Sequence, residues 1–186
     1  MGGYLMSEVK EKQSSNEERI SRRKLLKTAG CAGAAALVIS GFANKADAAN
    51  GIYPQVKVAN IRDLRAGRSV KFDYPLIGRK NIIMDMGCTV EGGVGTNKSI
   101  VAYSMFCSHL GCGVDMDWEK GNMICECHQS VYDPKRSGRV VEGPAPGSLP
   151  MVALNVDSST GDIYAAGVAG LIYGLRNNLL DGEEVG

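Results

Sequence analysis

Short stretches in which apolar and polar residues alternate dominate the chain after residue 68. In residues 69–75 (SVKFDYP), the apolar side chains Val70, Phe72 and Tyr74 occupy every second position. Because successive side chains of a β-strand point to opposite faces, this spacing places all three on one face of a strand. We therefore expect a strand here that is buried on one side.

Further strands are predicted where short apolar runs end at turn residues. Residues 122–125 and 139–142 are short β-like segments, and the predicted strands are residues 81–86, 99–106, 151–156 and 162–167. The last two flank residues 157–161 (DSSTG), a composition typical of a hairpin turn. No stretch of ten residues after residue 48 shows a helical period, and the chain has 24 glycines. The pattern predicts an all-β fold with many turns.

The first 48 residues form a separate segment. Residues 21–27 (SRRKLLK) match a twin-arginine export signal, and the weakly apolar residues 29–42 follow them. A membrane-spanning helix needs about 20 apolar residues, which is more than this stretch offers. Residues 46–48 (ADA) match a small-residue cleavage site. We predict a twin-arginine signal peptide over residues 1–48, a domain over residues 49–186, periplasmic localisation and no retained membrane span.

Charge is unevenly distributed between these two parts. Residues 1–48 contain eight Lys and Arg against five Asp and Glu, whereas residues 49–186 contain thirteen against fifteen, a net charge of −2. A nucleic-acid partner requires a concentrated basic surface. We therefore expect no nucleic acid among the partners of the predicted domain.

Both histidines of the chain lie beside cysteines in two short motifs. Cys107 and His109 form a C-x-H motif, and Cys125 and His128 form a C-x-x-H motif. Thiolates hold iron and sulfide well, and imidazoles suit the more reducible iron of a mixed cluster. The four side chains predict a [2Fe–2S] cluster with two cysteines on one iron and two histidines on the other.

A structural zinc site with two cysteines and two histidines is the alternative, because its ligands and spacings partly overlap. Zinc leaves no role for Cys112 and Cys127, which take matching places in the two motifs, so we favour the iron–sulfur interpretation. The other cysteine of the predicted domain is Cys88. We expect it to be buried as a small apolar side chain, as free cysteines often are.

The two motifs and their surroundings resemble the Rieske iron–sulfur protein family. Residues 125–133 (CECHQSVYD) are similar to its second cluster loop, and residues 143–146 (GPAP) to its proline-containing third loop. The resemblance implies antiparallel sheets with a cluster-binding subdomain inserted at about residues 103–148. It also implies roles for eight side chains: Cys107, His109, Cys125 and His128 as ligands of a Rieske-type [2Fe–2S] cluster, Cys112 and Cys127 as a disulfide, and Ser130 and Tyr132 as hydrogen-bond donors that raise the cluster's potential.

Within this family, the chain is most similar to the small subunit of arsenite oxidase. The similarity rests on the twin-arginine leader, on Gln129 after the second histidine and on residues 167–174. It implies an electron-transfer subunit of an oxidoreductase that is not catalytic alone. Its partners are then a molybdopterin-containing large subunit, which oxidises arsenite in a heterodimer, and a cytochrome c or small copper protein that accepts the electrons.

Two other functions share the cluster motifs. A Rieske subunit of a cytochrome bc complex, which oxidises quinol, accounts equally well for Ser130 and Tyr132, but it predicts a retained membrane helix. A soluble ferredoxin for a ring-hydroxylating oxygenase stays in the cytoplasm and usually lacks the extra cysteine pair. The export leader argues against the cytoplasmic ferredoxin. The apolar stretch of residues 29–42 is short for the membrane helix that a cytochrome bc subunit would retain.

Overall fold

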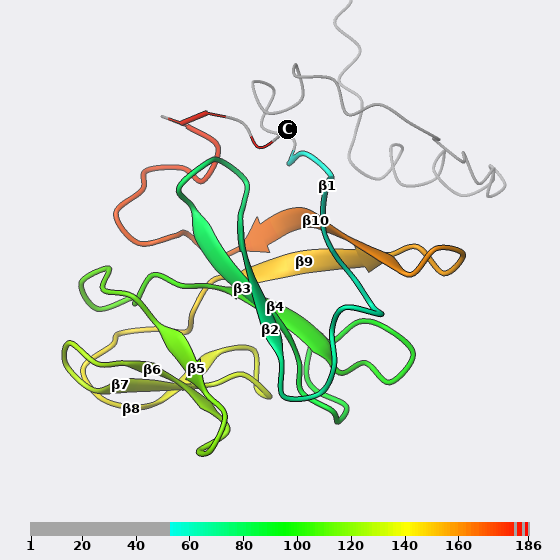
Figure 1. The fold of residues 1–186 in the computed structure, drawn as a ribbon. Helices are drawn as coiled ribbons and strands as arrows, with labels where there is room; N and C mark the ends of the chain where they lie inside the picture. Colours follow the sequence, from blue (N-terminus) through cyan, green and yellow to red (C-terminus); the bar gives the residue numbers. More distant parts are fainter. Residues whose placement is uncertain (1–52, 181, 184, 186) are drawn as a thin grey trace, which may run out of the picture. The chain divides into compact units, whose positions relative to one another are not determined.

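The computed structural model describes residues 53–180, 182, 183 and 185. The predicted signal peptide and its cleavage site lie outside this part of the chain, as do residues 49–52 of the predicted domain. The described residues form ten strands and no α-helix (Figure 1). None of them therefore belongs to a helix with the length and hydropathy that a membrane crossing requires.

The ten strands form two antiparallel sheets, which confirms the predicted all-β fold. The large sheet has the order β1-β10-β9-β4-β3-β2, with strands β1 (Val56–Asn60), β2 (Ser69–Asp73), β3 (Lys80–Asp85), β4 (Ile100–Ser104), β9 (Met151–Val156) and β10 (Asp162–Ala169). The small sheet has the order β5-β6-β7-β8, with strands β5 (Asp115–Asp117), β6 (Asn122–Cys125), β7 (Ser130–Asp133) and β8 (Arg139–Glu142). The small sheet is thus inserted between β4 and β9 of the large one (Figure 1).

The central strands β3 and β4 are buried on both faces of the large sheet. Ile82, Met84 and Tyr103 pack with residues of the small sheet. Ile83 and Ala102, at the intervening positions, pack in a second apolar cluster on the opposite face. A strand buried on both sides needs apolar residues at successive positions. This explains why both segments appear in the sequence as apolar runs rather than as clean alternations.

The two sheets share one hydrophobic core at their junction. The Tyr103 hydroxyl of β4 donates a hydrogen bond to the carbonyl of Pro134, in the turn between β7 and β8, at 2.9 Å. Gly138 packs against the Tyr103 ring so closely that an added Cβ would lie 3.0 Å from it. Lys71 of β2 also forms an ion pair with Asp115 of β5. The small sheet is therefore fixed on the large one by buried packing as well as by its two connections.

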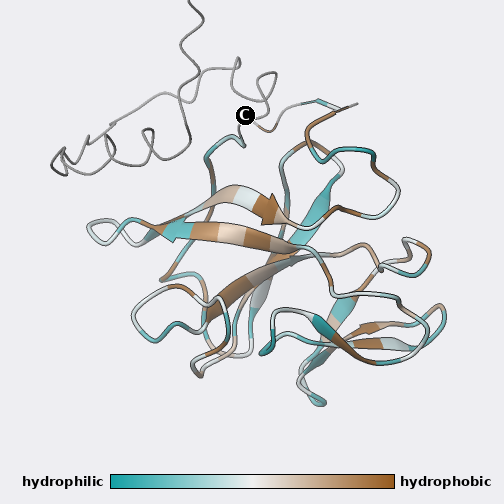
Figure 2. Ribbon diagram, turned by 180° about the vertical axis from the view of Figure 1, so that it is seen from behind, coloured by the Kyte–Doolittle hydropathy of each residue, from teal (hydrophilic) through white to brown (hydrophobic). Residues whose placement is uncertain are grey.

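The predicted hairpin is confirmed, and its second strand is two residues longer than expected. Strands β9 and β10 pair from Ile163 opposite Val156 to Ala169 opposite Met151. Asp157 accepts hydrogen bonds from the backbone and hydroxyl of Ser159 at 2.8 and 2.6 Å, which stabilises the turn. Figure 2 shows hydrophobic residues along the strands and hydrophilic residues at this turn.

Cys88 is exposed, so the expectation that it is buried is wrong. Strand β3 ends at Asp85, and the chain turns at Gly87, which has a φ of 67°. The alternation that buries the residues of β3 therefore does not extend to Cys88.

Candidate metal centre

Three loops meet at one end of the small sheet. The first loop connects β4 to β5 and is closed at its base by a backbone bridge between Phe106 and Gly113. Within it, the Cys107 amide donates to the carbonyl of Cys112, and the Gly111 amide donates to the carbonyl of Cys107, both at 2.8 Å. These two bonds make a compact turn that carries His109 at its outer part.

The second loop is a four-residue turn between β6 and β7, and strand register places the side chains at its two ends. Cys125 ends β6 and lies directly opposite Ser130, the first residue of β7. Opposed residues point to the same face, as do residues two apart on one strand. Cys125, Ser130 and Tyr132 therefore share one face of the small sheet, and all three are buried.

The structure brings the four predicted ligands together. The Tyr132 hydroxyl of the second motif lies 3.0 Å from the Cys107 sulfur of the first. The His109 and His128 rings meet edge to face with centroids 4.8 Å apart. Two thiols and two imidazoles that are far apart in sequence thus converge, with Cys107 and Cys125 buried and His128 exposed.

Two buried polar atoms at this site have no hydrogen-bond partner among the residues that the structure describes: Nδ1 of His109 and Oγ of Ser130. Leaving such groups unpartnered is costly, so each buried polar atom calls for a specific explanation. A metal bound at the imidazole nitrogen and a cluster sulfur that accepts the hydroxyl hydrogen would satisfy both atoms. The residues present therefore fit a [2Fe–2S] group.

The thiols differ in how readily they ionise. Burial raises the pKa of Cys107, but hydrogen bonds from the Tyr132 hydroxyl, the His109 amide and the Cys125 thiol outweigh burial and lower it overall. Burial and the neighbouring Cys107 sulfur raise the pKa of Cys125. Two thiolates this close repel each other, and iron cations remove that penalty. Burial, followed by the Cys107 sulfur, raises the pKa of Tyr132 to about 12, so its hydroxyl stays a donor at neutral pH.

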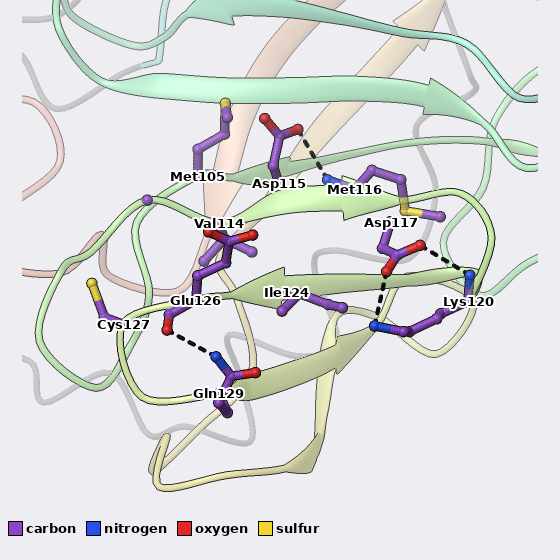
Figure 3. Close-up of a pocket in the computed structure, with 11 residues that line it drawn as sticks. Met105, Val114, Asp115, Met116, Asp117, Lys120, Ile124, Glu126, Cys127 and Gln129 are labelled. Carbon is purple, nitrogen blue, oxygen red and sulfur yellow. Dashed lines mark hydrogen bonds and ion pairs between the residues drawn. The ribbon is translucent and has the colours of Figure 1, made fainter.

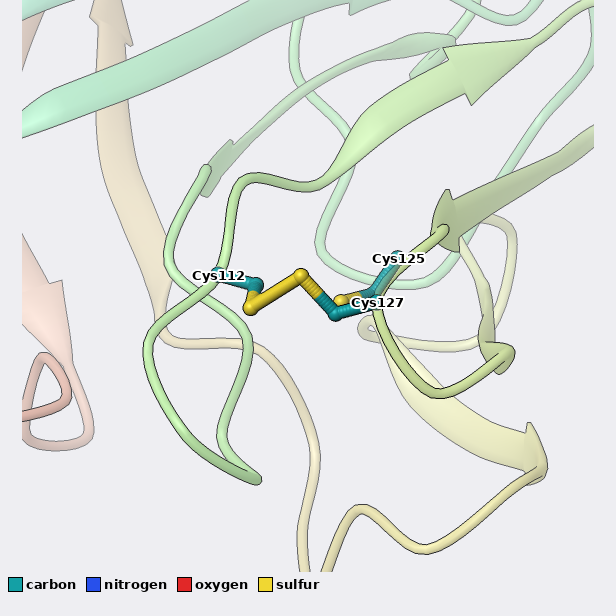
Figure 4. Close-up of side chains that lie close together, drawn as sticks. All are labelled: Cys112, Cys125 and Cys127. Carbon is teal, nitrogen blue, oxygen red and sulfur yellow. A yellow bond between two sulfur atoms is a disulfide. The ribbon is translucent and has the colours of Figure 1, made fainter.

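A disulfide joins Cys112 of the first loop to Cys127 of the second, with Cα atoms 6.5 Å apart (Figure 4). The Cys125 sulfur lies within 4.8 Å of both bridged sulfurs. Three neighbouring cysteines can suggest a metal site by themselves, but two of these sulfurs are already bonded to each other and offer no thiolate. The bridge instead ties together the two loops that carry the predicted ligands.

The third loop is attached to both of the others, and one of its contacts involves a residue that sequence reasoning missed. The Ser108 hydroxyl, between Cys107 and His109, donates to the carbonyl of Gly147 at 2.6 Å. At the other end of this loop, an added Cβ on Gly143 would lie 2.6 Å from the Gln129 carbonyl oxygen. The position of Ser108 between two ligands was the only signal available in the sequence.

An open pocket of about 850 Å³ lies along β5 and β6, next to the second loop (Figure 3). Its lining includes Asp115, Asp117, Lys120 and Glu126, and none of the four predicted ligands. Asp117 and Lys120 form an ion pair with each other at 3.2 Å. The pocket therefore adds nothing to the chemistry of the two cysteine–histidine motifs.

Comparison with known proteins identifies the class of this fold and site. Residues 55–153 match the Rieske [2Fe-2S] domain. The soluble domain of Rieske protein II from Sulfolobus acidocaldarius superposes with a TM-score of 0.58 and 31% identity, covering 67% of this chain and 83% of that one. The chain belongs to the Rieske family and carries a Rieske-type [2Fe–2S] cluster, which transfers one electron.

Two relatives match beyond the cluster motifs. Iodate reductase subunit IdrB from Pseudomonas sp. strain SCT is 34% identical over 160 residues, which cover 83% of this chain and 82% of the relative. The subunit of the same name from Denitromonas iodatirespirans is 36% identical over 129 residues, which cover 68% of this chain and 69% of the relative.

Proposed function

We propose that this chain is the electron-transfer subunit of an exported oxidoreductase that acts on an oxyanion. The observation that carries the proposal is the match to an iodate reductase subunit over about four fifths of both chains. A similarity confined to the cluster loops would indicate only the cofactor. A similarity that covers most of both chains supports a shared assembly with a catalytic subunit.

The residues of this chain have distinct tasks in that role. Cys107, Cys125, His109 and His128 hold the cluster, which supplies one-electron chemistry when bound. The buried Tyr132 hydroxyl donates towards the Cys107 sulfur, which favours the more negative, reduced state. The exposed side of His128 leaves a short path for electrons to a docked partner.

Two substrates of a molybdopterin-containing large subunit fit this proposal, and they require opposite directions of electron flow. Gln129 and residues 167–174 resemble the arsenite oxidase small subunit and favour arsenite as the electron source. The two iodate reductase subunits favour iodate as the electron acceptor. In either case a cytochrome c or small copper protein completes the chain of electron carriers, in the periplasm.

The experiment uses the tagged full-length chain, isolated from the periplasmic fraction of its native host together with its partner. Arsenite added to the oxidised complex produces the Rieske EPR signal if the complex oxidises arsenite. Iodate added to the reduced complex abolishes that signal if the complex reduces iodate. Either result, with molybdenum in the purified complex, supports the proposal.

Quinol provides the opposing outcome. A cluster that is reduced only by quinol, in a membrane fraction that also contains cytochromes, assigns the chain to a cytochrome bc complex. That result would contradict both the proposed oxyanion substrate and the proposed molybdopterin-containing large subunit.

A further inference from the structure

The C-terminal segment after β10 is held in a fixed turn by one buried side chain. Asn178 is 5% exposed, and its oxygen accepts from the Ile172 amide at 2.9 Å. Its amide group donates to the carbonyl of Gly170 at 2.8 Å and to the hydroxyl of Tyr53 at 2.9 Å. Ile172 is buried at 2% exposure. Tyr53 in turn packs against the apolar cluster on one face of the large sheet, so this segment, residues 170–178, is attached to that cluster through Tyr53.

The anchored turn places the Tyr173 ring on the first cluster loop. An added Cβ at Gly111 would lie 2.6 Å from one carbon of that ring and 2.9 Å from the next. Gly111 also has a φ of 73°, a conformation that side chains disfavour. The ring thus packs directly against the backbone between His109 and the disulfide-bonded Cys112, although 62 residues separate Tyr173 from Gly111 in the chain.

We propose that Tyr173 is a positioning residue for the first cluster loop, and that Asn178 sets its place. The ring restrains the backbone at Gly111, two residues from His109, and so fixes the direction of the imidazole towards the cluster. The large sheet thereby controls a loop that belongs to the small one. This inference rests on His109 being a ligand and is independent of the substrate of the large subunit.

The test compares three variants of the full-length, cluster-loaded chain. Tyr173→Ala removes the ring, Tyr173→Phe keeps it without the hydroxyl, and Leu171→Ala is the matched control. Leu171 lies in the same turn and is 56% exposed. Its side chain is not among the atoms nearest to an added Cβ at Gly111. The readouts are the rate of cluster loss, followed by visible absorbance, and the line shape of the EPR signal of the reduced cluster.

Tyr173→Ala is expected to lose its cluster about two- to tenfold faster, the range that loss of one aromatic contact produces. Its EPR lines are expected to broaden, because the first loop samples more orientations. Tyr173→Phe and Leu171→Ala are expected to match the wild type in both readouts. Identical retention and line shape in Tyr173→Ala overturn the proposal, and so does an equal change in Leu171→Ala, which would indicate general loosening of the turn.

A double variant covers the case in which Tyr173→Ala folds poorly. Gly111→Ala introduces a methyl group into the space of the ring, so it damages cluster retention in the wild-type background. The double variant Gly111→Ala, Tyr173→Leu has a smaller side chain beside the new methyl group, so it is expected to regain part of the lost cluster retention. Simple additivity of the two effects contradicts direct contact between the residues.

Discussion

At the scale of single residues, two buried tyrosines show how the partner of a hydroxyl decides its role. The Tyr132 hydroxyl lies 3.0 Å from the Cys107 sulfur and 3.2 Å from the Ser108 amide, which donates to it. The Tyr103 hydroxyl donates to the Pro134 carbonyl between the two sheets. Both rings are fully buried. We therefore expect the first hydroxyl to act on the cluster and the second to act on the stability of the fold.

Tyr132→Phe is expected to lower the reduction potential of the cluster. A hydrogen bond worth about 1 kcal/mol more to the reduced state raises a one-electron potential by about 40 mV, and the variant loses that amount. A redox titration followed by EPR measures it. Tyr103→Phe is the matched control: it is expected to lower the free energy of unfolding by about 1 kcal/mol and leave the potential unchanged. Equal potentials in wild type and Tyr132→Phe contradict the tuning role.

Replacing any one of the four predicted ligands with alanine is expected to abolish the Rieske EPR signal. Each substitution removes one of the two protein ligands of one iron, and the two nearby cysteines of the described residues, Cys112 and Cys127, cannot replace it because they are bonded to each other. Iron content and EPR of each purified variant test this. Cys88→Ala is the control, because Cys88 is an exposed free cysteine outside the site. A ligand variant that keeps a normal signal removes that residue from the ligand set.

At the scale of elements, the β-like segments of the sequence correspond to seven of the ten described strands, and β1, β5 and β7 were missed. Strand β5 has only three residues, Asp115–Asp117, and one apolar side chain. It is recognisable as a strand mainly because it pairs with β6. Strand β1, Val56–Asn60, is an edge strand that pairs only with β10. Both segments form strands because they pair in register with a neighbouring strand, and the sequence of the segment alone does not specify that pairing.

The disulfide acts between elements, because it ties the first loop to the second. Its removal in the double variant Cys112→Ser, Cys127→Ser is expected to lower the free energy of unfolding by about 3 kcal/mol, from the loop entropy of a 15-residue separation. Denaturant unfolding measures this loss. The cluster is also expected to be released faster. An unchanged half-life of the cluster would show that the loops hold it without the bridge.

Strand β1 is attached to β10 partly by charge, which gives its stability a pH dependence. Asp162 accepts from Lys57 at 2.8 Å and from Asn60 at 2.6 Å, and these bonds lower its pKa below the ordinary 3.8. A carboxyl with a lowered pKa in the folded state stabilises the fold above pH 3.8 and loses that effect as the pH falls through the folded value.

Asp162→Asn is therefore expected to be less stable than the wild type near neutral pH, with a difference that shrinks in acid. Urea unfolding at several pH values measures it, with Glu119→Gln as the control at an exposed carboxyl in the turn between β5 and β6. A difference that stays constant down to low pH contradicts this account of the ion pair.

At the scale of the whole described domain, the shared core makes the two sheets one unit. Ile82 and Tyr103 of the large sheet pack in the same cluster as Met123 and Tyr132 of the small sheet. Thermal unfolding of the cluster-loaded and the iron-depleted protein is expected to give a single transition each, with the depleted form unfolding at lower temperature. Calorimetry tests this, and two separate transitions would show that the small sheet unfolds independently.

The candidate site was largely predictable because its chemistry is local in the sequence. Cysteine and histidine motifs with short spacings indicate a metal cluster, and the resemblance supplied the roles of Ser130 and Tyr132. The contact between Tyr173 and Gly111 has no such signal. It forms only when residues 170–178 pack on the first cluster loop, and the residue pattern of neither segment predicts a contact with the other.

The closeness of the Cys125 sulfur to the disulfide has a consequence for the order of assembly. A free thiolate next to a disulfide is a competing nucleophile, and exchange would pair it with a sulfur that belongs to the bridge. Iron bound at Cys125 removes that competitor. We therefore expect the cluster to be inserted before the bridge closes, and we expect an empty protein that meets an oxidant to form disulfides that remove a ligand thiolate from the site.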